Sequence, residues 1–164
     1  MARTSAGLLL YRTNDAGDLE VLLVHPGGPI WASRDAGAWS IPKGEYGGDE
    51  DPATRAGIEF AEELGHAPPT GRRIDLGEVV QAGGKRVHAW AMRGDLDVDD
   101  VTSNEFEMEW PPRSGRHQRF PEVDRARWFT LRDARAKLNA GQLPLLQRLP
   151  DAITTDEQRG PCED

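Results

Sequence analysis

Three glutamates lie within five positions of one another, at Glu59, Glu62 and Glu63. If this stretch is helical, the three carboxylates share one face, because residues three and four apart are neighbours on a helix surface. Glu59 and Glu63 would then repel each other by about 0.2–0.5 kcal/mol. A divalent cation reverses this cost, since Mg²⁺ and Mn²⁺ prefer hard oxygen ligands. The alternative interpretation is a solvated acidic face, which is a common surface feature.

The flanking residues predict the helix that such a face requires. Asp51 is a favourable N-cap residue, Pro52 suits the first helical position, and Gly65 is the residue type that ends helices in a left-handed turn. The apolar residues between them recur at spacings of three and four: Ala53, Ala56, Phe60 and Leu64. This period predicts a stripe that faces a core, with the acidic face beside it.

The same stretch resembles a known family motif. The Nudix box consists of a glycine, five residues, a glutamate, seven residues and then R-E-U-x-E-E-x-G-U, where U is aliphatic. Six positions match it at this spacing: Gly44, Glu50, Glu59, Glu62, Glu63 and Gly65. Six accidental matches have odds of about 10⁻⁴. The resemblance covers roughly Arg3 to Leu149. The W-S-I-P-K-G-E entry and the F-P-E-V-D-R-A-R-W-F run are similar to the diadenosine-polyphosphate hydrolase branch.

This resemblance implies an α/β fold, the Nudix α/β/α sandwich with a mixed central sheet. It implies a pyrophosphohydrolase that needs Mg²⁺ (or Mn²⁺). Glu59 and Glu63 would be the principal metal ligands, with Glu62 as a further ligand or the base. The carbonyl of Gly44 would supply another oxygen, and Glu50 would have a supporting role. The resemblance does not assign the base to one glutamate.

Two positions depart from the family pattern. Ile58 stands where the box has an arginine, and His66 occupies the final aliphatic position. In the family that arginine is thought to orient the catalytic carboxylate, so its replacement bears on rate rather than on fold. Arg55 lies four residues before Glu59 and can approach it on the same helix face. We leave open whether Arg55 takes over this role.

Basic residues outside the helix are candidates for substrate binding. Lys43 directly precedes the box and can meet a phosphate as a point charge, or it is an ordinary surface lysine. Residues Pro111 to Pro121 form the only strongly basic segment of an acidic chain, and we predict a loop there. That contrast favours contact with an anion. The segment contributes three candidates: Arg116, His117 and Arg119.

A fourth catalytic glutamate is implied by the resemblance alone. In several Nudix enzymes a glutamate from the loop before the final strand reaches the metal or the attacking water. Glu122 occupies this place here, although it can equally pair with Arg125.

The five tryptophans are candidates both for the core and for stacking on a base. We expect core positions for Trp39 and Trp128, which belong to predicted strands. Trp31 lies in a Gly/Pro loop before the box, and Trp110 ends a predicted strand beside the basic segment. For both, core or loop anchoring is favoured over a base platform.

Length and composition limit the possible classes of protein. A chain of 164 residues is expected to form one domain with a proper core. A net charge of −8 disfavours stable binding of nucleic acid but not of a small polyphosphate. A lone cysteine, Cys162, fits a reducing compartment. Because we find neither an apolar run of membrane-spanning length nor a signal peptide, we expect a cytoplasmic protein without a membrane partner. The oligomeric state is open.

Hydrophobic periodicity predicts strands split around helices, with hairpins rather than repeated crossovers, which suggests a mixed sheet with helices on both faces. The expected strands are Ser5–Tyr11, Leu19–Val24, Trp39–Gly44, Asp75–Gln81, Lys85–Met92, Glu105–Trp110 and Arg127–Thr130. Two further helices are expected at Leu131–Leu138 and Leu143–Leu149. We predict a Nudix hydrolase domain over residues 1–149 and a mobile C-terminal tail over residues 150–164.

Three functions are compatible with these features. The favoured one is metal-dependent cleavage of the pyrophosphate linkage in nucleoside diphosphates linked to another group, with dinucleoside polyphosphates or nucleoside triphosphates as substrates. The second is a catalytically weak Nudix-fold module that senses a nucleotide. The third is an RNA 5′-end pyrophosphohydrolase, which the net charge disfavours.

Overall fold

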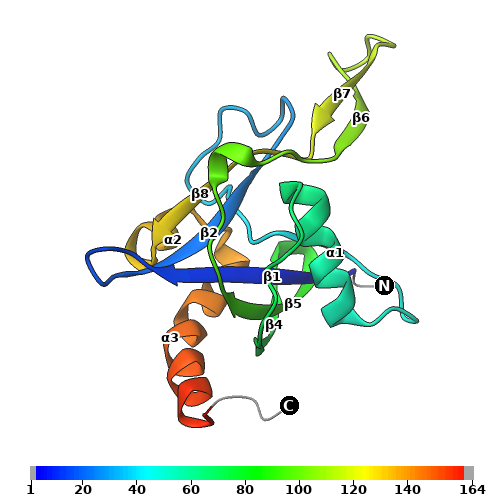
Figure 1. Cartoon of the computed structure of the whole chain (residues 1–164). Coiled ribbons are helices and arrows are strands. Elements are labelled where there is room, and N and C mark those ends of the chain that lie inside the picture. Colours follow the sequence, from blue (N-terminus) through cyan, green and yellow to red (C-terminus); the bar gives the residue numbers. More distant parts are fainter. Residues whose placement is uncertain (1–2, 161–164) are drawn as a thin grey trace.

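The computed structural model describes residues 3–160 as a sheet flanked by helices (Figure 1). The strands are β1 Thr4–Thr13, β2 Leu19–Pro26, β3 Lys43–Glu45, β4 Arg73–Val80, β5 Arg86–Arg93, β6 Glu105–Glu109, β7 His117–Pro121 and β8 Val123–Thr130. The α-helices are α1 Pro52–Leu64, α2 Leu131–Lys137 and α3 Leu143–Gln158. Short 3₁₀ turns lie at η1 Ala82–Gly84, η2 Val98–Asp100 and η3 Ala140–Gln142.

The main sheet is mixed, as predicted. Its strands follow the order β4-β5-β1-β2-β8, and β3 pairs with β1 off this path. β1 and β5 run parallel, whereas the other pairs are antiparallel. A hairpin joins β1 to β2, where the side-chain oxygen of Asn14 accepts hydrogen bonds from the N–H groups of Ala16 and Asp18. Such a local bond explains why asparagine favours this turn.

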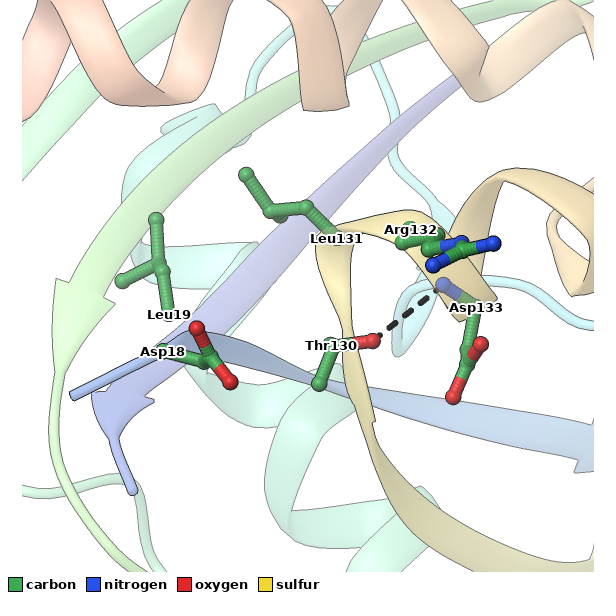
Figure 2. A pocket seen from close by; sticks show the side chains of 6 residues that line it. All are labelled: Asp18, Leu19, Thr130, Leu131, Arg132 and Asp133. Carbon is green, nitrogen blue, oxygen red and sulfur yellow. Dashed lines mark hydrogen bonds between the residues drawn. The ribbon is translucent and has the colours of Figure 1, made fainter. Parts of the chain in front are cut away.

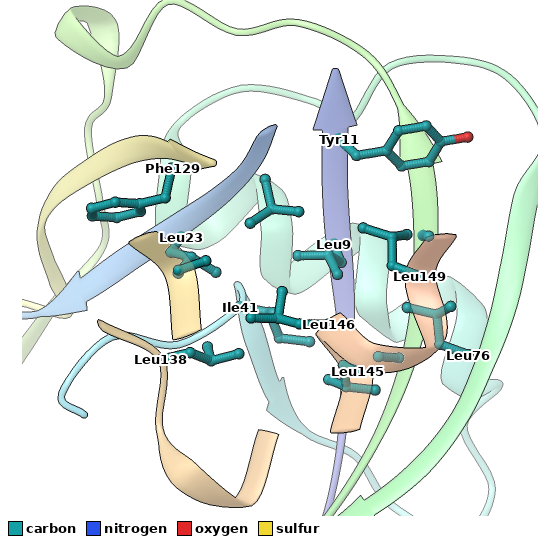
Figure 3. Packing of buried hydrophobic residues seen from close by; sticks show 14 of the residues in the cluster. Leu9, Tyr11, Leu23, Ile41, Leu76, Phe129, Leu138, Leu145, Leu146 and Leu149 are labelled. Atoms are coloured by element: carbon teal, nitrogen blue, oxygen red, sulfur yellow. The ribbon is translucent and has the colours of Figure 1, made fainter. Parts of the chain in front are cut away.

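Alternating residues of β1 divide the core into two layers. Leu9 and Tyr11 belong to one cluster, which Figure 3 shows packed against α3. Leu8 and Leu10 belong to the other cluster, which includes Ala56, Phe60 and Leu64 of α1. The leucines that α3 contributes are Leu145, Leu146 and Leu149. Helices therefore cover both faces of the sheet, and the predicted α/β/α sandwich is confirmed.

The last helix is longer than the sequence pattern suggested. We predicted its end at Leu149 and a tail without a core face from Pro150, but α3 continues to Gln158. Ile153 is only 9% exposed and packs with the core one turn after Leu149. Burial of Ile153 stabilises the helix beyond Pro150, although a proline inside a helix removes one backbone hydrogen bond. Cys162 lies outside the described residues. Within residues 3–160, no helix is long and apolar enough to cross a bilayer.

The segment predicted as a basic loop is partly a strand. Residues 117–121 form β7, which pairs antiparallel with β6 from Glu105↔Pro121 to Glu109↔His117. The two strands make a hairpin outside the main sheet, and it stands clear of the sheet in Figure 1. The sequence of β7 is mostly polar and exposed, so it shows no strand periodicity of its own. Hydrogen bonds to β6 therefore stabilise β7 as a strand, although its sequence does not alternate between apolar and polar residues.

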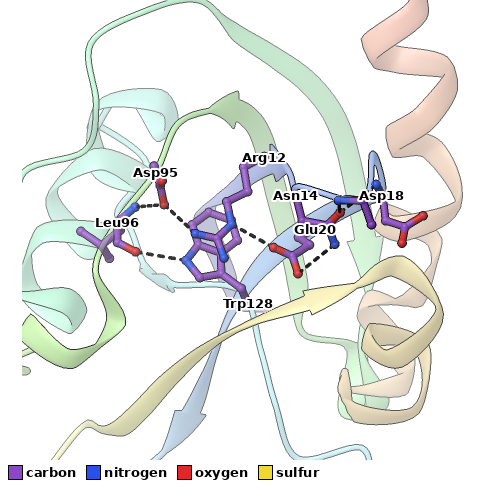
Figure 4. Close-up of polar contacts among 8 residues, drawn as sticks. Arg12, Asn14, Asp18, Glu20, Asp95, Leu96 and Trp128 are labelled. Carbon is purple, nitrogen blue, oxygen red and sulfur yellow. Dashed lines mark hydrogen bonds and ion pairs between the residues drawn. The ribbon is translucent and has the colours of Figure 1, made fainter.

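Arg12 joins the sheet to the segment that follows β5 (Figure 4). Its guanidinium bonds Glu20 at 2.9 Å and Asp95 at 2.7 Å, and it lies 4.0 Å above the ring of Trp128. The indole N–H of Trp128 donates to the carbonyl of Leu96. Trp128 is therefore a half-buried anchor packed on the core, whereas Trp39 is fully buried, as predicted.

Candidate active site

Helix α1 begins and ends as its sequence predicts. The Asp51 side chain accepts a hydrogen bond from the Thr54 N–H at 3.1 Å, and Pro52 occupies the first turn. Gly65 ends the helix with φ at 74°, in the left-handed region, and its N–H donates to the carbonyl of Ala61. These caps fix the helix start and end, so the acidic face has a defined position.

Glycine at position 44 lets the carboxylate of Glu59 lie against β3. A Cβ atom on Gly44 would be only 1.9 Å from Cδ of Glu59, so any larger residue would displace that carboxylate. Glu59 is 7% exposed, which is unusual for a glutamate. The backbone of Gly44 and the side chain of Glu59 are therefore neighbours, as required of two groups predicted to bind one metal.

Arg55 reaches Glu59 across one helical turn. Its Nε donates to Oε1 of Glu59 at 2.9 Å, and Nη2 contacts the same oxygen. Another guanidinium nitrogen lies 3.7 Å from Glu50. Ile58, which stands where the box has arginine, is 42% exposed. Arg55 therefore does contact Glu59, as the sequence allowed, and it also lies near Glu50.

Glu63 carries the most perturbed carboxylate of the cluster. Its Oε2 atom is buried and has no hydrogen-bond partner. The pKa of Glu63 is raised to about 8, mainly by burial and also by the negative charges of Glu59 and Glu122. The charge and the backbone N–H of Lys43 act in the opposite direction. A buried acceptor without a partner is costly, and a bound cation is one group that can satisfy it.

Lys43 is half-buried beside the acidic face. The pKa of its ammonium group is lowered to about 8, mainly by burial and also by the nearby charge of Lys85. The carboxylate of Glu63 favours the charged form. Lys43 is therefore a desolvated cation beside the acidic face, and its contact with a phosphate stays a prediction.

Glu122 lies beside the acidic face although it is far from α1 in the sequence. Burial raises the pKa of this carboxyl, and the charges of Glu59 and Glu62 add to the shift. Backbone hydrogen bonds fix the position: the N–H of Asn104 donates to the carbonyl of Glu62, and the N–H of Glu122 donates to that of Asn104. Arg125, the alternative partner considered for Glu122, contacts Asp124 at 3.6 Å. The structure thus brings Glu122 to the three helix glutamates.

The donor set fits a hard divalent cation. It offers carboxylate oxygens, a buried Glu63 oxygen without a partner and the close approach of Gly44 to Glu59. Within residues 3–160, no three His, Cys, Asp or Glu side chains already form a complete ligand group. Both contacts from Arg55 are to Oε1 of Glu59, so Arg55 can hold this carboxylate while Oε2 serves as a metal ligand.

The three basic candidates lie on the hairpin, away from this cluster. Arg116, His117 and Arg119 are all exposed, and His117 lies 3.5 Å from Glu107 on the opposite strand. Because each strand residue advances the chain by about 3.3 Å, Arg116 is several residues up the hairpin from Glu122. The structure does not bring these side chains to α1, and their role in substrate binding stays a prediction.

An apolar cleft that we did not predict lies on the other side of Glu122. Its volume is about 350 Å³. It is lined by Pro26, Gly27, Gly28, Ile30, Trp31, Phe106, Met108 and Glu122. Its walls come from the loop after β2 and from β6, which are far apart in the sequence. The only signal in the sequence was the tryptophan in a Gly/Pro loop, for which we favoured anchoring.

A larger hollow of about 510 Å³ lies where the β1–β2 hairpin meets α2 (Figure 2). Within it the Thr130 hydroxyl accepts a hydrogen bond from the N–H of Asp133, which caps α2. None of the glutamates of α1 lines this hollow. Size alone is therefore a poor guide here, and the acidic face of α1 is the better candidate for chemistry.

A family model matches most of the chain. The model of the NUDIX domain matches residues 1–149. The chain therefore belongs to the Nudix family. This membership makes it a Nudix-type pyrophosphohydrolase acting on nucleotide-like substrates. No curated protein matches the chain at a significant level.

Several solved structures share the fold. A C. elegans Ap4A hydrolase binary complex has a TM-score of 0.66 and 23% identity, covering 94% of this chain and 99% of that one. The NUDIX domain of Shewanella oneidensis NrtR, complexed with ADP ribose, has a TM-score of 0.63 and 16% identity, covering 93% and 89%. A Nudix hydrolase from M. smegmatis, RenU, has a TM-score of 0.58 and 21% identity, covering 98% and 89%. At these identities the likeness concerns the fold.

Proposed function

We propose that this chain is a divalent-metal-dependent hydrolase that cleaves the pyrophosphate linkage of nucleoside diphosphates joined to another group. Dinucleoside polyphosphates and nucleoside triphosphates are the favoured substrates. One observation carries the proposal: a buried carboxylate oxygen of Glu63 without a partner, within a group of four glutamates. This arrangement costs stability in the metal-free protein and becomes favourable when a cation binds.

The residues that would hold Mg²⁺ (or Mn²⁺) are Glu59, Glu62, Glu63 and the carbonyl of Gly44. A bound divalent ion supplies charge neutralisation at the phosphates and lowers the pKa of a water. Arg55 holds Glu59 in the metal-free protein and remains close enough to orient it.

Two further side chains have chemistry suited to the reaction. Lys43 places a desolvated positive charge beside Glu63, where it can meet a phosphate oxygen. The raised pKa of Glu122 makes this carboxylate a better proton acceptor from water than an exposed one. Glu62 and Glu122 are accordingly the two candidate bases.

The test is a substrate panel with Mg²⁺, its products resolved by chromatography, for the native chain and for Glu63→Gln. We expect EDTA to abolish turnover and the substitution to lower kcat by roughly 10²–10⁴-fold. Glu157→Gln on α3 is the matched control, because Glu157 is exposed and distant in sequence from the box. Undiminished turnover in Glu63→Gln would remove the assignment.

A second candidate function is a nucleotide sensor with little turnover. Ile58 at the arginine position and the engagement of Glu59 by Arg55 favour it. The related NUDIX domain of NrtR was crystallised with ADP ribose. Tight nucleotide binding without products on the panel would support the sensor and exclude the hydrolase.

A further inference from the structure

A buried histidine outside the acidic face is bonded at both nitrogens of its ring. His25 lies on β2, and its side chain is fully buried. Its Nδ1 atom is 2.9 Å from Oδ1 of Asp124, and its Nε2 atom is 2.6 Å from the carbonyl oxygen of Arg34. A carbonyl oxygen only accepts, so Nε2 donates, and one proton lies between Nδ1 and the carboxylate of Asp124. His25 therefore joins the loop after β2 to the start of β8.

Asp124 is the extra residue of a β-bulge. The pairing of β2 with β8 shifts by one residue after His25, where Pro26 pairs with Val123 and Asp124 is passed over. Val123 and Ala126 are three residues apart, yet both pack in the core layer that contains α1. In a regular strand, residues at odd spacing point to opposite faces of the sheet. The bulge therefore sets which way the chain before Asp124 faces, because a slip of one residue reverses it.

Glu122 belongs to the short stretch that this bulge directs. Its carbonyl accepts from the N–H of Gly27 at 2.9 Å, and its own N–H donates to the carbonyl of Asn104 at 2.8 Å. A Cβ atom on Gly27 would lie 1.9 Å from the carbonyl oxygen of Pro121, so the loop packs tightly against the chain before the bulge. In this position the charges of two glutamates of α1 act on the Glu122 carboxyl. The bulge and the loop together therefore hold Glu122 at the acidic face.

The neighbours of His25 fix its ring in one orientation. The Trp39 ring meets it edge to face, with centroids 5.2 Å apart, and the Trp39 indole N–H donates to Asp35 at 2.8 Å. Arg125 lies over the Trp39 ring, 5.4 Å from its centroid, and 3.6 Å from Asp124. His25 thus presents Nδ1 at one place, and this gives the partly exposed carboxylate of Asp124 a defined position.

We propose that His25 is a positioning residue for hydrolysis: its bond to Asp124 holds the β-bulge that places Glu122 beside the glutamates of α1. The proposal rests on the proposed function, in which Glu122 is a candidate base. His25 acts through Asp124 and the backbone, because its ring is buried and both of its nitrogens are engaged. A base must stay within hydrogen-bond reach of the water that it activates. Loss of the bond to Asp124 therefore lowers the rate of the reaction more than the affinity for substrate.

The kinetic test is a double-mutant cycle between Asp124 and Glu122. Asp124→Ala removes the partner of His25 at a partly exposed position, so the core stays packed. We expect kcat to fall by roughly 10- to 100-fold with little change in KM, as for a misplaced catalytic group. In the Glu122→Gln background the same substitution should cost less than about twofold, because no carboxylate is left to position. A merely structural role would give equal losses in both backgrounds.

Two substitutions at His25 separate its two bonds. An asparagine side chain places an amide nitrogen near the position of Nδ1, whereas a glutamine side chain places one near Nε2. His25→Asn should therefore keep the bond to Asp124 and most of kcat, and His25→Gln should keep only the bond to Arg34 and lose kcat. Arg125→Ala is the matched control: it removes the other contact of the Asp124 carboxylate and should keep kcat within about twofold. Melting temperatures of all variants check that the fold is kept.

Amide hydrogen exchange reads the same geometry without turnover. In EDTA-treated protein, Asp124→Ala should speed the exchange of the N–H groups of Gly27 and Glu122 by roughly 10-fold, with the amides of β1 and β5 as internal reference. Unchanged exchange at both amides would overturn the proposal. So would equal kinetic losses in the two backgrounds, or a kcat that His25→Asn lowers as much as His25→Gln. A native chain without turnover would remove the proposed function, and the exchange rates would still decide whether Asp124 holds Glu122 in place.

Discussion

The acidic face of α1 and the apolar cleft beside Glu122 differ in how the chain encodes them. The acidic face comes from one helix, whose glutamates are neighbours because of their spacing alone. The cleft brings residues 26–31 together with β6, two segments that lie far apart in the sequence. One site is thus a local pattern and the other a product of tertiary packing. Glu122 is where the two meet.

Their energetics differ as well. The acidic face gathers like charges and buries a carboxylate oxygen without a partner, so it opposes folding until a counter-charge arrives. The cleft leaves aromatic surface in water, which costs hydrophobic burial but no electrostatic work. We therefore expect changes at the acidic face to alter kcat and metal binding.

The larger expected effect concerns Arg55. Arg55→Ala frees Glu59 from its partner one turn away, and we expect kcat to fall by roughly 10- to 100-fold with little change in KM, as for residues that orient metal ligands. The double variant Arg55→Ala, Ile58→Arg returns an arginine to the same helix and should recover most of the loss. Steady-state kinetics on the best substrate of the panel measures both.

A purely structural role for Arg55 and a role in orienting Glu59 predict different results. A purely structural salt bridge would change the melting temperature and leave kcat of the folded enzyme intact. If the single variant keeps its kcat, or if Ile58→Arg alone raises kcat while Arg55→Ala does nothing, Arg55 has no role in orienting Glu59.

A smaller effect is expected from proton linkage in the metal-free protein. The pKa of Glu63 is about 8 when folded against an ordinary value of 4.5, so between these pH values the folded state holds a proton that the unfolded state has released. The free energy of unfolding should therefore fall as pH rises from about 5 to 8. Lys43 has a folded pKa of about 8, below 10.5, so its contribution changes only at higher pH and in the opposite direction.

Urea unfolding of EDTA-treated protein between pH 5 and 8 measures this slope. Glu63→Gln should flatten it, because glutamine does not titrate. Equal slopes in the native chain and in this variant would show that Glu63 does not hold a proton at neutral pH.

The sequence revealed features encoded locally and missed those that depend on distant partners. Asp51 and Gly65 cap α1 through bonds within one turn, and the fold class followed from similar local patterns. The strand at residues 117–121 was missed because its order comes from pairing with β6. The end of α3 was misplaced because Pro150 signals a helix end, whereas burial of Ile153 is visible only in the packed core.

The residues of the candidate site show the same difference between local patterns and distant partners. Glu59, Glu62 and Glu63 followed from their spacing, and the family resemblance added Gly44 and Glu122. Trp31 was assigned to anchoring because a single exposed aromatic residue in a loop has no periodicity to reveal its partners. Its place in the cleft depends on the opposite wall at β6, which only the fold brings to it.

Manganese binding tests the central claim most directly. In a crystal soaked with Mn²⁺, anomalous scattering locates the ion independently of any activity. We predict an ion beside Glu59 and Glu63, within reach of the Gly44 carbonyl, with Arg55 still bonded to Oε1 of Glu59. An acidic face without an ion would contradict the metal site and the hydrolase built on it.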